Sequence, residues 1–469
     1  SSGRKMQMRK WVVIFFAVCL LTAIGSAVAF VDFRAQTKDI RVTTIVESGD
    51  PAYADSLVFE TLCSLEQVRW QTESKWKHGE MTTVTDCTSY GTPVVFLPSY
   101  FRTQNEVLVY EQLQDVEYWW NTMVLPRNCG NSGKVSLREI SPYYNLNVSY
   151  WLGYAYVVDL NTTEYLKIKT LDEEKVLLYR DSYWDRDDNS GEVYECYDFR
   201  YQTRQGEDYY EPEIWSACTD TAVYLVINNR SAGGQVMDFS DTPGGYGIWR
   251  IPISPAIHST YSEKTLEGVE YFSDYRYGEV EQFLPLDTEK NVRSLTMDEN
   301  MNNLFLLSET DGVYEVTVID IHSAKVLAEV SLGKLDATEY SRFYSFSGAD
   351  FGAVYEPETR RLSLVREKTA GEWTMERIQM QEDNPFDTAY RNRTYLRMAC
   401  DGERLAVVCR VPDRIDYKEY AETSIWVFAD GEQKYKKTFY TSFDELDYYE
   451  ANEVDNKVKM RDFRIRFTE

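Results

Sequence analysis

The residues whose spacing most resembles a metal site lie near the middle of the chain. Asp185, Asp187 and Asn189 carry side-chain oxygens at alternate positions of an acidic segment. A calcium-binding loop uses this alternation, because it lets the backbone curl around the cation. The EF-hand loop also has Gly at its sixth position and Glu at its twelfth, where this chain has Ser190 and Cys196. The spacing therefore allows a calcium site, and a solvated hairpin turn is the alternative that we favour.

The longer segment around this loop, from position 179 to 215, mixes tyrosine, tryptophan, aspartate and arginine. Protein interfaces are enriched in aromatic residues and arginine. A long loop that connects two structural repeats and binds no partner protein is the alternative. The composition predicts an interaction surface formed by five aromatic residues, namely Tyr183, Trp184, Tyr209, Tyr210 and Trp215.

The sequence indicates no catalytic residue and no cofactor other than the calcium considered above. Only His258 among the three histidines lies near Ser and Glu, and no nucleophile-elbow pattern accompanies it. The segment 130–134 lacks the full phosphate-loop spacing, and Val135 replaces its Ser or Thr. A catalytic pair of carboxylates, as in glycosidases, is not excluded, because 76 acidic residues make carboxylate pairs inevitable. An exported carbohydrate-active enzyme is therefore the alternative to a binding protein.

Net charge and hydropathy patterning bear on partners and location. A formal charge of −26 argues against binding to nucleic acid and to anionic lipid. Four basic residues, Arg4, Lys5, Arg9 and Lys10, precede an uncharged apolar run over 11–31, which is long enough to span a bilayer as a helix. Because basic residues stay on the cytoplasmic side, the rest of the chain is expected outside the membrane.

This pattern predicts four parts. They are a cytoplasmic tail over 1–10, a transmembrane anchor or signal segment over 11–31, a stalk over 32–45 and an extracytoplasmic domain over 46–469. The expected location is the cell membrane, with a single pass. Secretion after cleavage that follows Ala29 is the alternative, because small residues precede that position.

The sequence pattern predicts short strands, and these strands must position any functional site. The clearest unit is Val316–Asp320, a polar turn, and then Val326–Val330, with Asp at the strand end suited to closing an Asx turn. A second unit places a polar turn before a strand, as at Asp298–Asn303 before Leu304–Leu307. Together these units give a repeat of four short strands, which implies one small sheet per repeat. A stack of such sheets closed into a ring is a β-propeller.

The segment 294–333 resembles the YVTN-type repeat of bacterial surface propellers. Asp298, Phe305, Asp320, Lys325 and Gly333 are among the residues that take the matching places, and 399–439 fits the same pattern with a long insertion. The resemblance implies an all-β fold, a β-propeller. The repeat length gives about seven four-stranded blades, with six to eight possible, and the apolar run 11–31 places them behind one N-terminal transmembrane helix. We also expect 458–467 to form a strand that closes the ring, and 156–159 to pair with 165–168.

The function that fits these features is a membrane-tethered, extracytoplasmic binding or sensing module. Its expected partners are the membrane, through the N-terminal helix, and an envelope protein or glycan. Cysteine spacing would allow the pairs Cys63–Cys87 or Cys196–Cys218 in an oxidising compartment. We favour several of the cysteines as small buried apolar residues.

Overall fold

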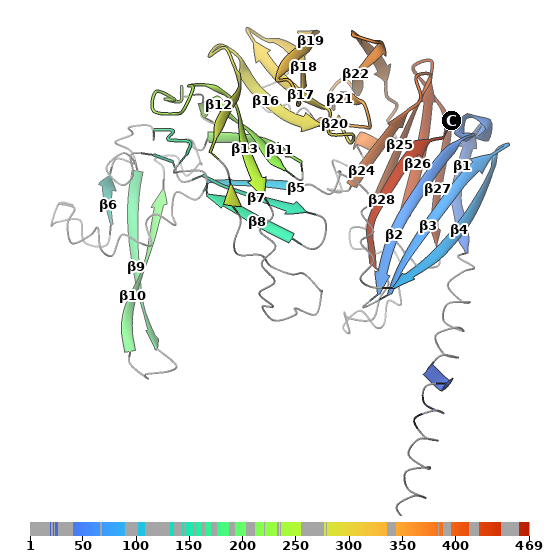
Figure 1. The fold of residues 1–469 in the computed structure, drawn as a ribbon, viewed down its shortest axis with the longest axis horizontal. Helices are drawn as coiled ribbons and strands as arrows, with labels where there is room; N and C mark the ends of the chain where they lie inside the picture. The colour runs from blue at the N-terminus through green and yellow to red at the C-terminus, as the bar shows by residue number, and fades with distance from the viewer. Residues whose placement is uncertain are drawn as a thin grey trace, which may run out of the picture. The chain divides into compact units, whose positions relative to one another are not determined.

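The chain is built almost entirely of β-strands in the computed structural model (Figure 1). Two compact units share the chain, unit 1 over 1–96 with 380–469 and unit 2 over 97–379. The residues that the structure describes are a few positions between 19 and 26, and then 41–65, 68–89, 102–107, 132–135, 143–144, 146–152, 156–161, 165–169, 176–186, 193–202, 212–219, 221–231, 234, 236–254, 276–277, 279–334, 344–382, 384–387, 395–411, 422–441 and 459–468.

Unit 1 joins the two ends of the described chain in two antiparallel sheets. Their strand orders are β1-β27-β26-β25-β24 and β28-β2-β3-β4, so an N-terminal strand completes one sheet and a C-terminal strand completes the other (Figure 1). The predicted closing strand is thereby confirmed, since β28 pairs with β2 from Leu57↔Phe467 to Ser64↔Lys459. The elements are β1 (Val42–Gly49), η1 (Pro51–Ala54), β2 (Leu57–Leu65), β3 (Val68–Lys77), β4 (Glu80–Ser89), β24 (Tyr395–Cys400), β25 (Arg404–Val411), β26 (Glu422–Ala429), β27 (Glu432–Thr441) and β28 (Lys459–Phe467).

The two sheets of unit 1 share one apolar core. Period-2 alternation puts Phe59, Phe463 and Ile465 on one face of the sheet β28-β2-β3-β4, where they pack with Ile425 and Phe439 of the other sheet. The rings of Phe59 and Phe439 meet edge to face, with centroids 6.1 Å apart. The two terminal strands are therefore held by core packing as well as by backbone pairing.

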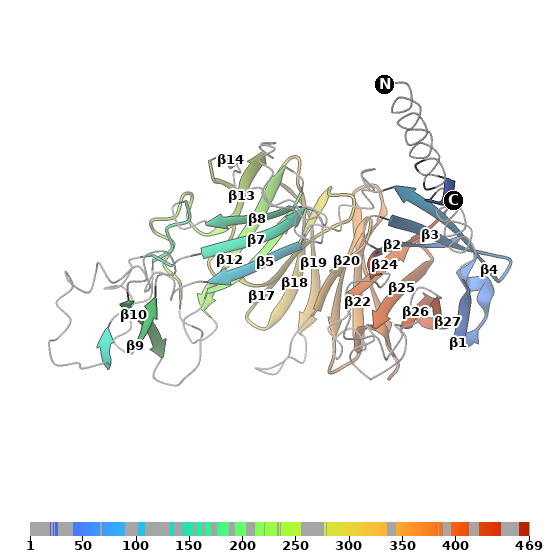
Figure 2. The same ribbon diagram turned by 90° about the horizontal axis from the view of Figure 1, so that it is seen from below.

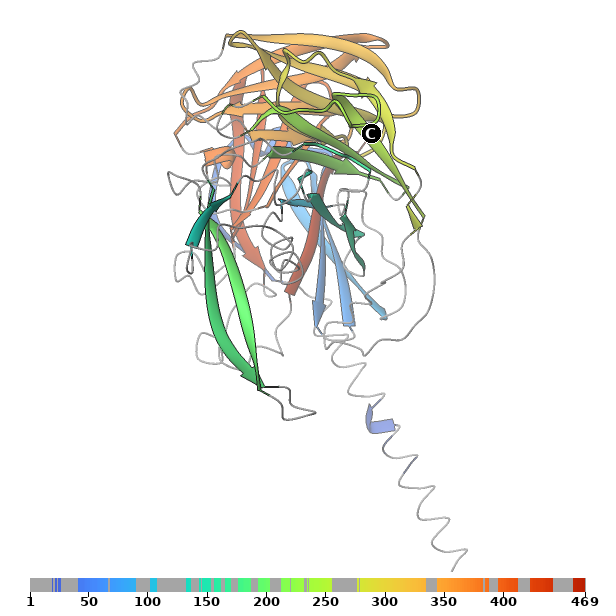
Figure 3. The ribbon, with the colours of Figure 1, turned by 90° about the vertical axis from the view of Figure 1, so that its left-hand side faces the viewer.

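Unit 2 consists of successive antiparallel sheets. Two are four-stranded meanders, β16-β17-β18-β19 and β20-β21-β22-β23, and a third has the order β11-β12-β13-β14 with β15 on β13. The other two are β5-β7-β8, whose strands run side by side in Figure 2, and β10-β9-β6, whose long green hairpin is seen in Figure 3. The fold class is thus all-β, as predicted, with the repeated four-stranded sheets that the sequence indicated.

The strands of unit 2 are short, as their turn signals suggested. Their bounds are β5 (Arg102–Val107), β6 (Ser132–Val135), β7 (Leu146–Leu152), β8 (Tyr156–Asn161), β9 (Val176–Arg186), β10 (Val193–Gln202), β11 (Pro212–Cys218), β12 (Ala222–Ser231), β13 (Gly247–Ser254), β14 (Arg276–Tyr277), β15 (Glu281–Pro285), β16 (Asn291–Met297), β17 (Asn303–Thr310), β18 (Val313–Asp320), β19 (Lys325–Lys334), β20 (Tyr344–Ser347), β21 (Phe351–Glu356), β22 (Arg361–Thr369) and β23 (Glu372–Gln379).

Aspartates close the turns in the way that their positions predicted. Asp320 Oδ1 accepts hydrogen bonds from the backbone N–H of His322 at 2.9 Å and of Ser323 at 2.7 Å, at the end of β18. Asp298 Oδ1 accepts from Asn302 N at 2.7 Å and Asn303 N at 3.1 Å before β17. Both carboxylates satisfy backbone donors that the turns leave unpaired, so the sequence signal is a turn signal.

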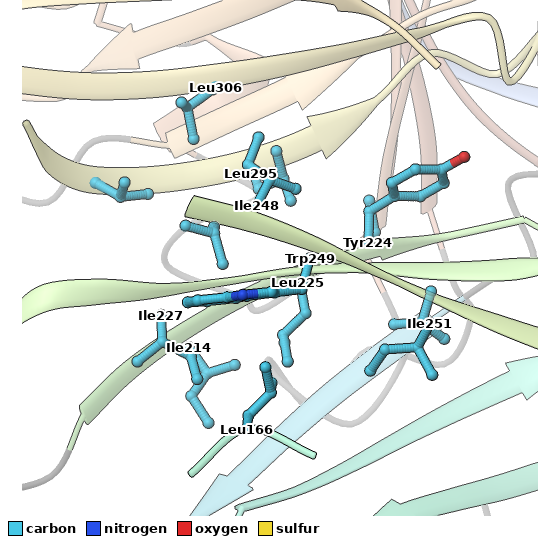
Figure 4. Packing of buried hydrophobic residues seen from close by; sticks show 14 of the residues in the cluster. Leu166, Ile214, Tyr224, Leu225, Ile227, Ile248, Trp249, Ile251, Leu295 and Leu306 are labelled. Atoms are coloured by element: carbon cyan, nitrogen blue, oxygen red, sulfur yellow. The ribbon is translucent and has the colours of Figure 1, made fainter. Parts of the chain in front are cut away.

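A large apolar core of unit 2 joins the sheets that contain β12 and β16. Figure 4 shows Trp249, Leu225 and Ile227 on one side of β12 and β13, and Ile248 and Leu295 on the other side. Both faces of β12 are buried, which explains its unbroken apolar run from Ala222 to Ile227. This core fixes the first strands of the two sheets beside each other.

One predicted hairpin is wrong. β8 pairs with β7 rather than with 165–168, and Lys169 instead bridges Tyr143 on one side and Asp238 on the other. The segment 165–169 has the alternation of a strand, with Leu166 and Ile168 buried, but it covers the unit 2 core as an extended loop. Alternation reports burial on one face and does not identify the partner strand.

The cysteine pairings considered from the sequence do not form. Cys218 is free, and both Cys63 and Cys218 are buried. Cys63 lies opposite Trp70, and Trp70 lies opposite Cys87, so the two cysteines are two strands apart. That separation is about 9.5 Å between backbones, beyond the roughly 7 Å that a disulfide can bridge. Burial also raises the pKa of the Cys218 thiol, as expected of a cysteine that serves as a small apolar residue.

The N-terminal region is described only in part. Among the described residues, no helix is both long and apolar enough to cross a membrane. The expected anchor over 11–31 lies almost wholly outside those residues. β1 begins at Val42, inside the stretch expected to be a stalk.

Candidate functional site

The first strands of successive unit 2 sheets lie side by side. β11 contacts β5 and β16, and β16 in turn contacts β20. Each is the edge strand that begins its sheet, so its outer backbone edge is not covered by a strand of the same sheet. This arrangement gathers side chains from several sheets on one surface.

Partly exposed side chains of these strands are mostly polar or aromatic. β11 and β16 carry core residues such as Ile214 and Leu295 between half-buried residues, and all four residues of β20 are half-buried. We call the half-buried residues of these three strands the inner-strand surface, and it consists of Glu213, Trp215, Ser216, Asn291, Arg293, Thr296, Met297, Tyr344, Ser345, Phe346 and Ser347.

The Glu213 carboxylate is held by a buried asparagine. Asn228, only 2% exposed on β12, donates Nδ2–H to Glu213 Oε2 at 2.9 Å. Its Oδ1 accepts the backbone N–H of Val292 on β16 at 3.1 Å. The same amide therefore positions Glu213 and fastens one sheet to the first strand of the next.

The Arg293 guanidinium has an equally fixed position. Its Nη2 donates to Glu309 Oε2 at 3.0 Å, and Asn291 Nδ2 donates to the same oxygen at 3.2 Å. The other oxygen of Glu309 accepts the backbone N–H of Gly312 at 2.8 Å. Burial alone would raise the pKa of Glu309, but these hydrogen bonds outweigh it and hold that pKa below its ordinary value. Glu309 is thus ionised at neutral pH and orients Arg293.

Hydroxyl groups link β16 to β20 within this surface. Ser294 Oγ and Ser345 Oγ share a hydrogen bond, and Ser347 Oγ donates to the carbonyl oxygen of Met297 at 2.6 Å. These short side chains let the two strands approach closely. The inner-strand surface is consequently built from side chains that the fold has already oriented.

Two carboxylates with raised pKa values, those of Asp298 and Asp350, lie in turns beside this surface. Burial raises the pKa of Asp298, and repulsion from Asp350 adds to the rise. Burial also raises the pKa of Asp350, which lies in the turn between β20 and β21. Both oxygens of Asp298 accept hydrogen bonds from its own turn, Oδ2 from Asn303 Nδ2 at 2.7 Å. Asp298 is therefore committed to structure, and Asp350 is the more available acid.

The residues predicted from the sequence lie mostly outside what the structure describes. Asp187, Asn189, Tyr209 and Tyr210 are outside the described residues. Asp185, Tyr183 and Trp184 lie in β9, of which the backbone pairing with β10 is described. The segment that connects β9 to β10 lies outside the described residues, so the choice between a turn and a calcium loop stays a prediction.

Trp215 is the one predicted surface residue whose side chain is described. It is half-buried on β11, where it packs against the unit 2 core and belongs to the inner-strand surface. Sequence reasoning missed Glu213, Asn228 and Arg293. The signal that could have found Asn228 is a polar residue at the end of the apolar run of β12.

Metal binding was searched for among the residues with described side chains. No group of three or more His, Cys, Asp or Glu side chains there has a spacing that could hold a metal ion. The proposed calcium loop lies mostly outside that set.

Comparison with known proteins finds similar structures but no matching sequence. No family model and no curated protein sequence matches the chain. The β-propeller domain of Cps50 from Myceliophteria thermophila is 10% identical, covers 62% of this chain and 82% of its own, and gives a TM-score of 0.24. The WD40 domain of SCAP from fission yeast is 7% identical, with coverages of 87% and 88% and a TM-score of 0.26. The periplasmic gluconolactonase of Pseudomonas aeruginosa is 12% identical, with coverages of 69% and 95% and a TM-score of 0.24.

Proposed function

We propose that this chain is a membrane-tethered, extracytoplasmic β-propeller that binds an envelope protein through the inner-strand surface. Two features support the propeller. Successive antiparallel sheets place their first strands side by side, and strands from both ends of the chain complete the sheets of unit 1. About seven blades would account for the repeat spacing of the sequence.

The proposed location rests on charge patterning. Basic residues precede the uncharged run 11–31, and the chain carries a net charge of −26. A strongly acidic domain is repelled by anionic lipid headgroups, which suits a domain that works away from the membrane surface. The domain would then bind its partner at a distance from the bilayer.

The observation that carries the binding role is that both charged groups of the inner-strand surface are held in place by the chain itself. Asn228 holds Glu213, and Glu309 holds Arg293. Oriented charges beside Trp215 and several hydroxyls give a surface that loses little conformational entropy when a partner binds. Tryptophan and arginine are also the residue types that dominate binding energy at protein interfaces.

Crosslinking of intact cells that express the tagged full chain tests this role. Capture and mass spectrometry should recover one or two specific envelope proteins. Arg293→Met and Glu213→Gln should each lower that recovery about 10-fold, as expected for an interface residue that contributes about 1.4 kcal/mol. Arg250→Met is the matched control, because Arg250 pairs with Glu281 on outer strands of unit 2. Equal recovery by the wild type and both inner-strand variants would contradict the proposal.

A carbohydrate-active enzyme is the second candidate, and the raised pKa of Asp350 favours it. A carboxyl group whose pKa burial raises can serve as a general acid. A screen of polysaccharides with the purified full chain should then detect hydrolysis, and Asp350→Asn should reduce it about 100-fold. Absence of hydrolysis by the wild type would count against this candidate.

A further inference from the structure

The two charged residues of the inner-strand surface differ in how their charges are compensated. Arg293 is neutralised, because its Nη2 lies 3.0 Å from Glu309 Oε2. Glu213 has no such partner, since no lysine, arginine or histidine in the described part of the chain pairs with it. The charge that this surface leaves uncompensated is therefore the charge of Glu213.

The Glu213 carboxylate is held in place by a neutral group. Asn228 Nδ2 donates to its Oε2 at 2.9 Å, and Asn228 is itself fixed to the backbone N–H of Val292. The other oxygen, Oε1, accepts no hydrogen bond from the residues that the structure describes. Because Glu213 is half-buried, part of its hydration is already lost. A cation that reaches Oε1 would form a charge-assisted hydrogen bond, which is stronger than a neutral one.

Trp215 lies beside this carboxylate. It is two residues further along β11, so it shares a face of the strand with Glu213, and the residue between them, Ile214, is buried. Its Nε1 is buried as well, so any surface that the indole exposes is carbon. Two residues of a strand rise about 7 Å. A cation bound to Glu213 therefore comes within reach of the ring, which attracts cations at distances up to about 6 Å.

We propose that Glu213 and Trp215 form a subsite for a basic side chain, arginine or lysine, of the protein that binds the inner-strand surface. The inference rests on the proposed function and adds the chemistry of the partner to it. Charge complementarity selects this occupant, because an uncompensated carboxylate beside an aromatic ring binds a cation. The net charge of −26 steers a basic segment toward the chain.

An organic cation suits this subsite better than a metal ion does. No group of three or more His, Cys, Asp or Glu side chains in the described part of the chain could hold a metal, whereas a guanidinium needs only one carboxylate. A guanidinium can also stack on an aromatic ring while it bonds to a carboxylate. Arg293 does not oppose the incoming cation, because Glu309 compensates its charge.

Peptide binding to the purified full chain, kept in detergent, tests the subsite without the partner. The probe is acetyl-Gly-Arg-Gly-amide, and the neutral probe is the same peptide with citrulline in place of arginine. Saturation-transfer NMR titrations give both dissociation constants. The arginine peptide should bind about 10-fold more tightly, because citrulline keeps the size of arginine and loses its charge. Glu213→Gln should weaken binding of the arginine peptide about 10-fold, while its amide oxygen still accepts from Asn228.

Glu372→Gln is the matched control, because it removes the same charge at an exposed position on the outer strand β23. It should leave the dissociation constant of the arginine peptide unchanged. Trp215→Leu should raise that constant about 3-fold, and Trp215→Phe should raise it less, because phenylalanine keeps an aromatic face.

Equal dissociation constants for the two peptides would overturn the proposal, as would a Glu213→Gln variant that binds the arginine peptide as tightly as the wild type does. If either result accompanied capture of an envelope protein by the wild type, the proposed function would stand and only the basic subsite would be lost. Selective binding of the arginine peptide without capture of any envelope protein would reject the proposed partner and retain the subsite.

Discussion

Glu47 and Lys437 form an ion pair between an N-terminal and a C-terminal strand, with 3.0 Å between Oε2 and Nζ across 390 positions of sequence. The same carboxylate accepts the Tyr435 hydroxyl, whose pKa burial and this hydrogen bond raise. A contact of such long range forms only when both ends of the chain are in place. The stability of unit 1 therefore depends on strands from both ends of the chain, and this dependence can be measured.

Glu47→Gln should lower stability and change its dependence on pH. Burial is the largest single influence and raises the pKa of Glu47, but the hydrogen bonds from Tyr435 and Lys437 and the charge of Lys437 together outweigh it and set the pKa below the ordinary 4.5. Because the folded-state value is depressed, the contribution is present above about pH 4.5 and is lost as the pH falls through the folded pKa. Urea unfolding should show a loss of at most about 1 kcal/mol at pH 7, since Glu47 is partly solvated.

The loss for Glu47→Gln should shrink toward zero once the pH has fallen below the folded-state pKa of Glu47, where the carboxylate of the wild type is also protonated. Glu432→Gln is the control, because Glu432 pairs with Lys434 at a fully solvated position and should leave stability unchanged. A loss that stays constant from pH 7 to pH 3 would contradict the account.

Arg404→Met should destabilise unit 1 by about 2 to 4 kcal/mol. The guanidinium donates to the carbonyl oxygens of Tyr53 at 2.9 Å and Asp55 at 2.8 Å, and it lies over the ring of Phe467 at 4.5 Å. Its loss leaves two carbonyl groups without their donor at the point where both chain ends meet. Thermal unfolding followed by circular dichroism measures the effect, and a loss below about 0.5 kcal/mol would show that this arginine is dispensable.

Gly352→Ala should destabilise unit 2 by about 1 to 3 kcal/mol, because a Cβ there would lie 2.6 Å from the Phe305 ring of the preceding sheet. Adding Phe305→Leu should recover part of the loss, since a smaller side chain leaves room for the methyl group. Urea denaturation of the single and double variants measures the coupling. Purely additive effects would mean that the glycine is not required by this contact.

Asn228→Ala should cost about 2 to 3 kcal/mol, because it leaves the backbone N–H of Val292 and one oxygen of Glu213 without a partner. It should also weaken partner capture, because Glu213 then loses its fixed orientation. Thr221→Ala, at an exposed position just before the same strand, is the control. Unchanged stability of Asn228→Ala would contradict the account of these two hydrogen bonds.

The local fold could be predicted where a single segment determines it. Asp320 and Asp298 at strand boundaries predicted turns that their carboxylates indeed close. The alternation of 458–467 predicted a terminal strand, and β28 confirms it. These features depend on a few neighbouring residues, which is why one sequence is enough to find them.

The pairing of distant segments could not be predicted in the same way. The segment 165–168 has a strand-like pattern, yet it pairs outside the expected hairpin because alternation does not specify a partner. The inner-strand surface was missed for a related reason. Asn228 and Glu213 are meaningful only once two sheets bring them together, and nothing in their spacing of 15 positions indicates this contact.

A photo-crosslinking amino acid placed on the inner-strand surface tests the proposed function most directly. Incorporation in place of Thr296 on β16, in the full chain on intact cells, should give a discrete crosslinked product with an envelope protein on illumination. The matched control is the same amino acid in place of Val326, which is 45% exposed on the outer strand β19 of the same sheet. The account predicts a product from position 296 and none from position 326. Products of equal yield at both positions, or a product only at position 326, would contradict it.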